Sequence, residues 1–67
     1  MIKIEDAKWL QGQKVRYLFR ALPWEEPFWE DAIIMDYSSK RIKILHINAP
    51  GRGDVVKWVD PESLYEK

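Results

Sequence analysis

Residues 41–64 read RIKILHINAPGRGDVVKWVDPESL, and this stretch decides the fold. Two apolar runs of strand length, Arg41 to Ile47 and Val55 to Val59, flank a turn segment at 48–54 that holds one proline, two glycines and two Asx residues. Asp60-Pro61 then suits the start of a short helical turn, because proline has no N–H to leave unpaired. The stretch predicts two strands, a 3-10 turn and a final extended piece near Leu64.

Two further strands are expected upstream of this stretch. Residues 13–20 alternate, with Val15, Tyr17 and Phe19 on one face, as in a half-buried strand. Residues 29–37 are apolar on both faces, so pattern alone leaves open which face is the core. Residues 36–40 have turn composition, and we therefore expect an antiparallel hairpin between the second and third strands.

The chain has 67 residues, which is room for one small domain over residues 1–67. Residues 1–11 form an N-terminal lead-in that we expect to pack on the remaining structure. Its segment 3–10 is either a short helix or a strand that closes the sheet, and we favour a loosely helical segment. Among the core residues we expect Val15, Ile44 and Val56.

The expected strands carry an excess of apolar residues on their outer faces. A domain of this size seldom leaves so much apolar surface exposed, so something should cover it. Either the N-terminal segment folds back through Ile4, Trp9 and Leu10, which we favour, or a second copy of the chain does. We also expect Trp58 to pack against the segment that holds Trp9.

Charge and composition exclude several classes of protein. Eleven basic residues balance eleven acidic ones, so no global field steers the chain towards polyanions. There is no cysteine, no apolar stretch long enough for a membrane span, and no signal-peptide pattern, because Glu5 and Asp6 interrupt the N-terminus. We expect a soluble intracellular protein, cytoplasmic or nuclear, with no cofactor, no metal and no membrane partner.

Taken together, these elements predict an all-β fold, a small five-stranded antiparallel barrel of the Src-homology-3-like class with one short 3-10 turn. The segments Gly12-Gln-Lys-Val15, FWEDAII, RIKILH and VVKWVDPESL follow one another in an order that resembles a Tudor domain of the chromatin-reader type over residues 12–65. The resemblance is one of spacing and residue type, and Agenet and related small barrels fit it nearly as well.

The resemblance implies a binding site for a methylated lysine or arginine. Tudor readers hold the methylated cation among aromatic rings with an acidic residue nearby, and these places fall on Phe19, Trp29, His46 and Asn48. Ring faces attract a desolvated cation. Two places depart from the family pattern, since histidine presents a weaker ring face and asparagine carries no charge. Large aromatic residues carry most of the burial in a small core, so we favour a core or core-edge position for Phe19 and Trp29 over a place in the cage. His46, the only histidine, has no partner at metal or general-base spacing, and we favour a structural role for it.

The loop between the first two strands holds further candidate binding residues. Trp24 and Phe28 stand between or beside prolines in a polar loop, where they form either a recognition patch or a staple that pins the loop. An acidic groove for a basic peptide could be formed by Glu25, Glu26 and Glu30. A phosphate-binding patch could be formed by the basic residues Lys40, Arg41, Lys43 and Arg52.

No enzyme signature occurs in the chain: it has no phosphate-binding loop, nucleophile elbow, dinucleotide fingerprint or metal triad. We therefore expect a non-catalytic recognition module that binds a basic or methylated peptide, or a protein partner, through an aromatic and acidic groove. The alternative is a small barrel of phage or bacterial type that binds nucleic acid or regulates a protein by covering its surface. We expect a monomer, with a homodimer as the alternative.

Overall fold

The computed structural model describes all residues from 1 to 67. None of its helices is long and apolar enough to cross a membrane. In chain order the elements are α1 (Ile4–Ala7), β1 (Lys14–Phe19), β2 (Phe28–Tyr37), β3 (Ile42–Ala49), β4 (Gly53–Val59), the 3-10 turn η1 (Pro61–Ser63) and β5 (Leu64–Tyr65).

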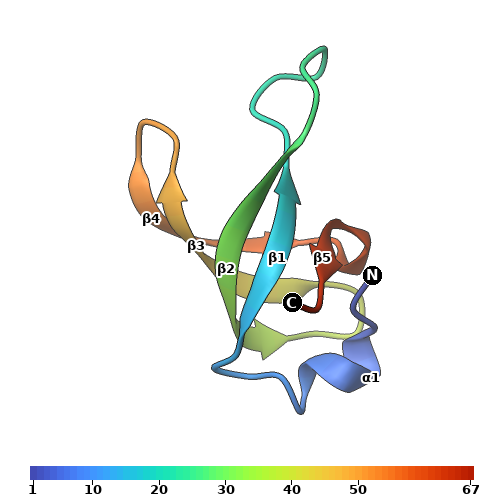
Figure 1. Cartoon of the computed structure of the whole chain (residues 1–67). Helices are drawn as coiled ribbons and strands as arrows, with labels where there is room; N and C mark the ends of the chain where they lie inside the picture. Colours follow the sequence, from blue (N-terminus) through green and yellow to red (C-terminus); the bar gives the residue numbers. More distant parts are fainter.

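The five strands form one sheet in the order β4-β3-β2-β1-β5, and every neighbouring pair is antiparallel. This confirms the all-β class, the five strands, the β2–β3 hairpin and the single 3-10 turn. The sheet is strongly curved, with a concave inner face and a convex outer face (Figure 1). Its edge strands β4 and β5 do not pair with each other, so the sheet is not closed and the expected barrel is not confirmed.

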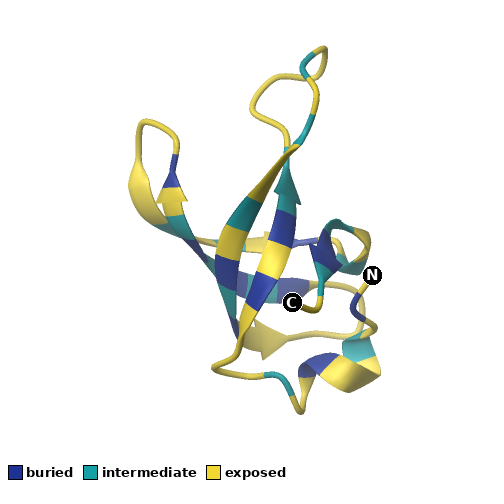
Figure 2. Cartoon of the chain, viewed as in Figure 1, coloured by how far each residue is buried: buried dark blue, intermediate teal, exposed yellow.

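The core lies on the inner face of the curved sheet. Alternate residues of each strand point inward, so buried and exposed bands alternate along β1 and β2 (Figure 2). Val15 lies opposite Ala32, and Ile44 lies opposite Ile34. Val15 and Ile44 are both buried, which confirms their expected place in the core. The buried apolar residues of this cluster are Ile2, Ala7, Val15, Tyr17, Ala32, Ile34, Ile42, Ile44, Val59 and Leu64.

The register of β2 answers the question that its two apolar faces left open. Ala32 and Ile34 face the core, whereas Ile33 lies opposite Leu45 on the outer face. The pairing shifts between Ile34 and Asp36, which leaves Met35 as an exposed, bulged residue. The bulge also adds to the local bend of the sheet.

The expectation that Val56 belongs to the core is wrong. Its side chain is 49% exposed and lies on the outer face, opposite Leu45. Val59 faces Ile42 on the inner side, and the two-residue period then places Lys57 inward and Val56 outward. The segment 55–59 is apolar on both faces, so composition could not settle this register.

The N-terminal segment folds back onto the sheet, but it covers the inner face. Ile2 and Ala7 join the core, and Leu10 packs against its margin. The Gly12 N–H donates to the Ile34 carbonyl oxygen at 2.7 Å, which ties the segment to β2. Trp9 is 76% exposed, so the covering role expected for it is wrong.

The outer face consequently stays uncovered. Trp58, which we expected to pack against the N-terminal segment, is exposed on that face. Cross-strand neighbours Ile33, Leu45 and Val56 form an apolar row across β2, β3 and β4. The N-terminal segment instead contributes Ile2 and Ala7 to the core on the inner face.

The glycine-rich loop is shorter than expected. Ala49 pairs with Gly53, so β3 and β4 continue to a tight tip at Pro50, Gly51 and Arg52. The positive φ of Gly51 (75°) is available to glycine at little cost and allows this tight turn. As a result, the β3–β4 hairpin projects from the sheet beside the first loop (Figure 1).

Candidate functional site

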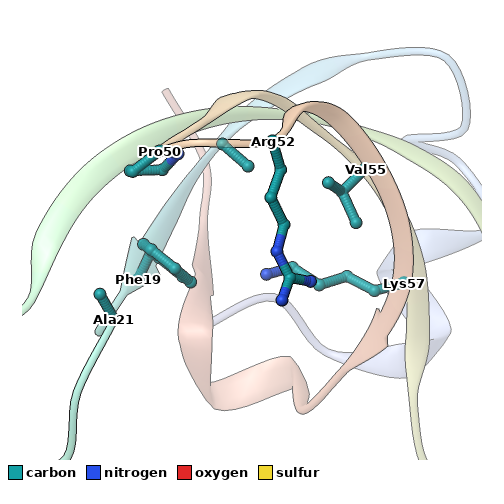
Figure 3. A pocket seen from close by; sticks show the side chains of 7 residues that line it. Phe19, Ala21, Pro50, Arg52, Val55 and Lys57 are labelled. Carbon is teal, nitrogen blue, oxygen red and sulfur yellow. The ribbon is translucent and has the colours of Figure 1, made fainter.

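A cleft of about 340 Å³ lies between the first loop and the β3–β4 hairpin. Phe19 and Ala21 line one side, and the hairpin forms the other side (Figure 3). The remaining lining residues are Ala49, Pro50, Arg52, Val55 and Lys57. This volume is at the lower end of the range that small-ligand sites occupy.

The cleft holds two positive charges and no negative one. The side chains of Arg52 and Lys57 extend into the same space (Figure 3). Neither cation has a carboxylate oxygen within 4 Å, whereas Lys14, Arg41 and Lys67 each lie within 4 Å of an aspartate oxygen. Two cations that share one hollow without a counter-charge form a site that favours an anion.

Two other hollows on the surface contain basic residues, but these residues are paired with carboxylates. One is lined by Arg41 and Asp60, which pair at 3.8 Å. The other contains Lys14 and Lys67, and both ammonium groups lie within 4 Å of Asp31. Their positive charges are already balanced by carboxylates.

Lys57 is held in place by aromatic rings. Its Nζ lies 4.8 Å from the ring centroid of Tyr17 and 4.6 Å from that of Phe19. Contacts of this kind contribute about 0.5 to 2 kcal/mol each. Burial lowers the pKa of Lys57, and the nearby charge of Arg52 lowers it further. An anion in the cleft would remove part of this electrostatic penalty.

His46 lies behind the aromatic floor of the cleft. Its side chain is 0% exposed, and its ring centroid is 4.9 Å from that of Phe19 and 5.1 Å from that of Tyr17. Neither imidazole nitrogen has a hydrogen-bond partner, although Glu30 Oε1 lies 3.5 Å from Nε2. Burial lowers the pKa of His46 and the Lys57 charge lowers it further, against the opposing effect of Glu30. The imidazole is therefore neutral near pH 7.

The four residues that the Tudor resemblance singled out are not all on one face. Phe19 and His46 lie together on the inner side, as described above. Trp29 lies on the outer face, where the Arg16 guanidinium is 4.7 Å from its ring centroid and the Tyr65 ring packs edge-on at 5.2 Å. Asn48 is exposed near the tip of the β3–β4 hairpin with φ 54°, and its N–H donates to Asp54 Oδ1 at 3.0 Å.

Two aromatic residues in or next to the first loop are exposed: Trp24 within the loop and Phe28 at the start of β2. Phe28 is 57% exposed and lies directly opposite Phe19 in the β1–β2 ladder, so the two rings share a face. Trp24 is 79% exposed on the loop that begins beside Ala21. Phe28 and Trp24 thus present two large aromatic side chains to solvent, and Phe28 does so on the face of the sheet that carries Phe19.

The three residues of the expected acidic groove come from two elements, the first loop and β2. Glu30 points to the inner side, next to His46. Glu25 and Glu26 lie within the loop itself, five and four residues before it along the chain, and make no ion pair.

The basic patch expected from the sequence is also dispersed. Lys40 and Arg41 precede β3, and Arg52 follows it, so they lie at opposite ends of this strand. Lys43 lies opposite Trp58 on the outer face. Only Arg52 of these four residues lines the cleft.

Lys57 is a cleft residue that the sequence pattern did not predict. A lysine in a strand is normally assigned to the solvent face, but a long alkyl chain lets the ammonium emerge from an inward position. The signal was present in the alternation of Val55, Lys57 and Val59, which share a face. No group of three or more Asp, Glu or His side chains lies in an arrangement that could hold a metal ion.

Comparison with known proteins identifies no relative. The chain matches no protein-family model, no curated protein and no solved structure at a level that indicates relatedness.

Proposed function

We propose that this chain is a non-catalytic binding module that holds an anionic group of a partner in the cleft between the first loop and the β3–β4 hairpin. The observation that carries the proposal is the convergence of Arg52 and Lys57, without any carboxylate partner, beside the Phe19 ring. Partial burial of the Lys57 ammonium beside the Arg52 charge is costly, and a bound anion offsets that cost.

The scaffold that we propose is an incompletely closed barrel of the Src-homology-3-like group. The strong curvature of the sheet and the 3-10 turn between its two edge strands support this assignment. The first loop and the β3–β4 hairpin would then be the two projections that flank the binding site of the barrel.

The sign of the charge favours an anion over a methylated cation. The place among Tyr17 and Phe19 that would receive such a cation already holds the Lys57 ammonium. A methylated peptide would have to displace this side chain and then meet the charge of Arg52. Of the two functions expected from the sequence, binding of a polyanion therefore has the better support, whereas a methylated or basic peptide requires rearrangement of the cleft.

Calorimetric titration with inorganic polyphosphate, at two salt concentrations, tests the proposal. The affinity should fall as salt rises, because phosphate contacts release counterions. Lys57→Gln and Arg52→Ala should each weaken binding several-fold. Lys40→Ala removes one charge at the opposite end of β3 and should leave the affinity unchanged. Binding of a trimethyl-lysine peptide, with no binding of polyphosphate, would overturn the proposal.

A second candidate function uses the outer face. The row of Ile33, Leu45 and Val56, together with exposed Trp58, fits a protein partner, and a second copy of this chain is the first partner to test. Light scattering should then show a mass that rises with concentration in the wild type and not in Val56→Lys. A monomeric mass at every concentration would remove the second copy as the partner.

A further inference from the structure

We infer that the anionic partner is a single-stranded nucleic acid, whose phosphate lies between Arg52 and Lys57 while a neighbouring base stacks on exposed Phe28 at the start of β2, with Trp24 of the first loop as a second exposed ring. This inference rests on the proposed anion-binding cleft. It specifies which anionic polymer the cleft binds, and it assigns the stacking of bases to Phe28 and Trp24.

The cleft combines the two features that single-strand binding requires. Such proteins pair a positively charged groove for the backbone with aromatic side chains on which bases stack. Arg52 and Lys57 supply the charge, and the Phe19 ring forms the adjoining wall. Phe28 continues this wall, because it is the direct cross-strand neighbour of Phe19 and remains more than half exposed.

The geometry favours single strands over duplexes. A hollow of about 340 Å³ between two projecting segments can admit a phosphate and part of one nucleotide, but it cannot enclose a double helix. Phe28 and Trp24 offer ring faces, and a base can reach a ring face only when it is not stacked inside a duplex. The same aromatic residues have no use in recognising a simple acidic peptide, whose side chains are not planar rings.

The charge of the cleft sets the expected salt dependence. Two cations that contact phosphates should give a slope of about −1.4 in a plot of log affinity against log salt, at about −0.7 per contact for single strands. Lys57→Gln should reduce the slope by about 0.7. A substitution at Phe28 removes stacking and no charge, so it should weaken binding without changing the slope.

Fluorescence anisotropy with labelled 12-mers tests the inference. The probes are oligo(dT), an abasic strand with the same number of phosphates, a duplex and a poly-glutamate peptide. Oligo(dT) should bind at least about fivefold more tightly than the abasic strand, the lower end of the effect of one stacked base. Phe28→Ala and Trp24→Ala should reduce this preference, whereas Trp9→Ala, which removes an equally exposed tryptophan beside α1, should not.

The possible results separate the inference from the proposed function. Equal binding of oligo(dT) and the abasic strand, both weakened by Arg52→Ala, would overturn the nucleic-acid inference and leave the anion-binding cleft in place. Preference for the duplex or for poly-glutamate would also overturn the inference. Failure of every probe to bind, together with failure of polyphosphate, would overturn both. Melting temperatures of the variants near that of the wild type would show that lost binding does not reflect unfolding.

Discussion

The Lys57 ammonium lies 4.6 Å from the centroid of the Phe19 ring, on the concave side of the sheet. The two residues come from opposite sides of the cleft, β4 and β1, which do not pair with each other. Their contact therefore spans the concave inner side of the sheet, from β4 to β1. It also directs a positive charge into the cleft beside Arg52, which is the basis of the proposed function.

His46 should make the stability of the protein depend on pH. Burial lowers its pKa in the folded state below the usual value of about 6.5. Between these two values the unfolded chain binds more protons than the folded chain, so the free energy of unfolding falls as pH is lowered through about 6.5. Urea denaturation at pH 7.5 and 5.5 should show lower stability at the acidic pH, and His46→Phe should reduce the difference. An unchanged difference in this variant would assign the pH dependence to other groups.

Lys57 and Glu30 should act on the pKa of His46 in opposite directions. The Lys57 charge lowers it, and the neighbouring Glu30 carboxylate raises it. In Lys57→Met, which keeps a long apolar side chain, the pKa of His46 measured by NMR should rise. In Glu30→Gln, which keeps the shape of the side chain, it should fall. A shift in the same direction in both variants would contradict the arrangement of charges around the imidazole.

The N-terminal segment should stabilise the fold through Ile2 and not through Trp9. Ile2 is buried in the core, so Ile2→Ala should lower the free energy of unfolding by about 2 kcal/mol or more. Trp9→Ala removes an exposed side chain and should change it by less than about 0.5 kcal/mol. Urea denaturation of both variants measures the difference. A larger loss for Trp9→Ala would show that this side chain packs against the sheet in solution.

Substitutions on the inner face of β3 and β4 should lower the free energy of unfolding more than substitutions on the outer face. Ile44→Ala opens a cavity in the core and should cost about 2 to 5 kcal/mol. Val56→Ala, on the exposed outer face, should cost much less than this. Thermal unfolding followed by circular dichroism distinguishes the two variants. Equal losses would mean that the outer face is covered in solution, as a second copy of the chain would cover it.

The elements of the fold were predictable from the sequence because local signals agreed with one another. The alternation of Val15 and Tyr17 indicates a strand, and the turn residues after Tyr37 indicate a hairpin. Asp60-Pro61 indicates the start of the 3-10 turn η1. The position of Val56 was not predictable, because residues 55–59 are apolar on both faces and a shift of one residue exchanges them. Closure of the sheet depends on contacts between β4 and β5, which no local pattern encodes.

The candidate site was predictable only in part. Phe19 and Arg52 stood out from the sequence, and the structure places both in the cleft. Trp29 has the residue type of a cage member, but its strand position turns it to the opposite face. Lys57 was not predicted as a site residue, because its position depends on the rings of Tyr17 and Phe19 in β1, about 40 residues earlier in the chain.

The most direct test of the anion-binding cleft is an NMR titration of the labelled protein with inorganic polyphosphate. The largest changes in amide chemical shift should fall at Phe19 and Ala21 and between Ala49 and Lys57, the two sides of the cleft. Changes that instead concentrate at Lys14, Arg16 and Lys43 on the outer face, or an absence of changes at millimolar ligand, would contradict the proposed site.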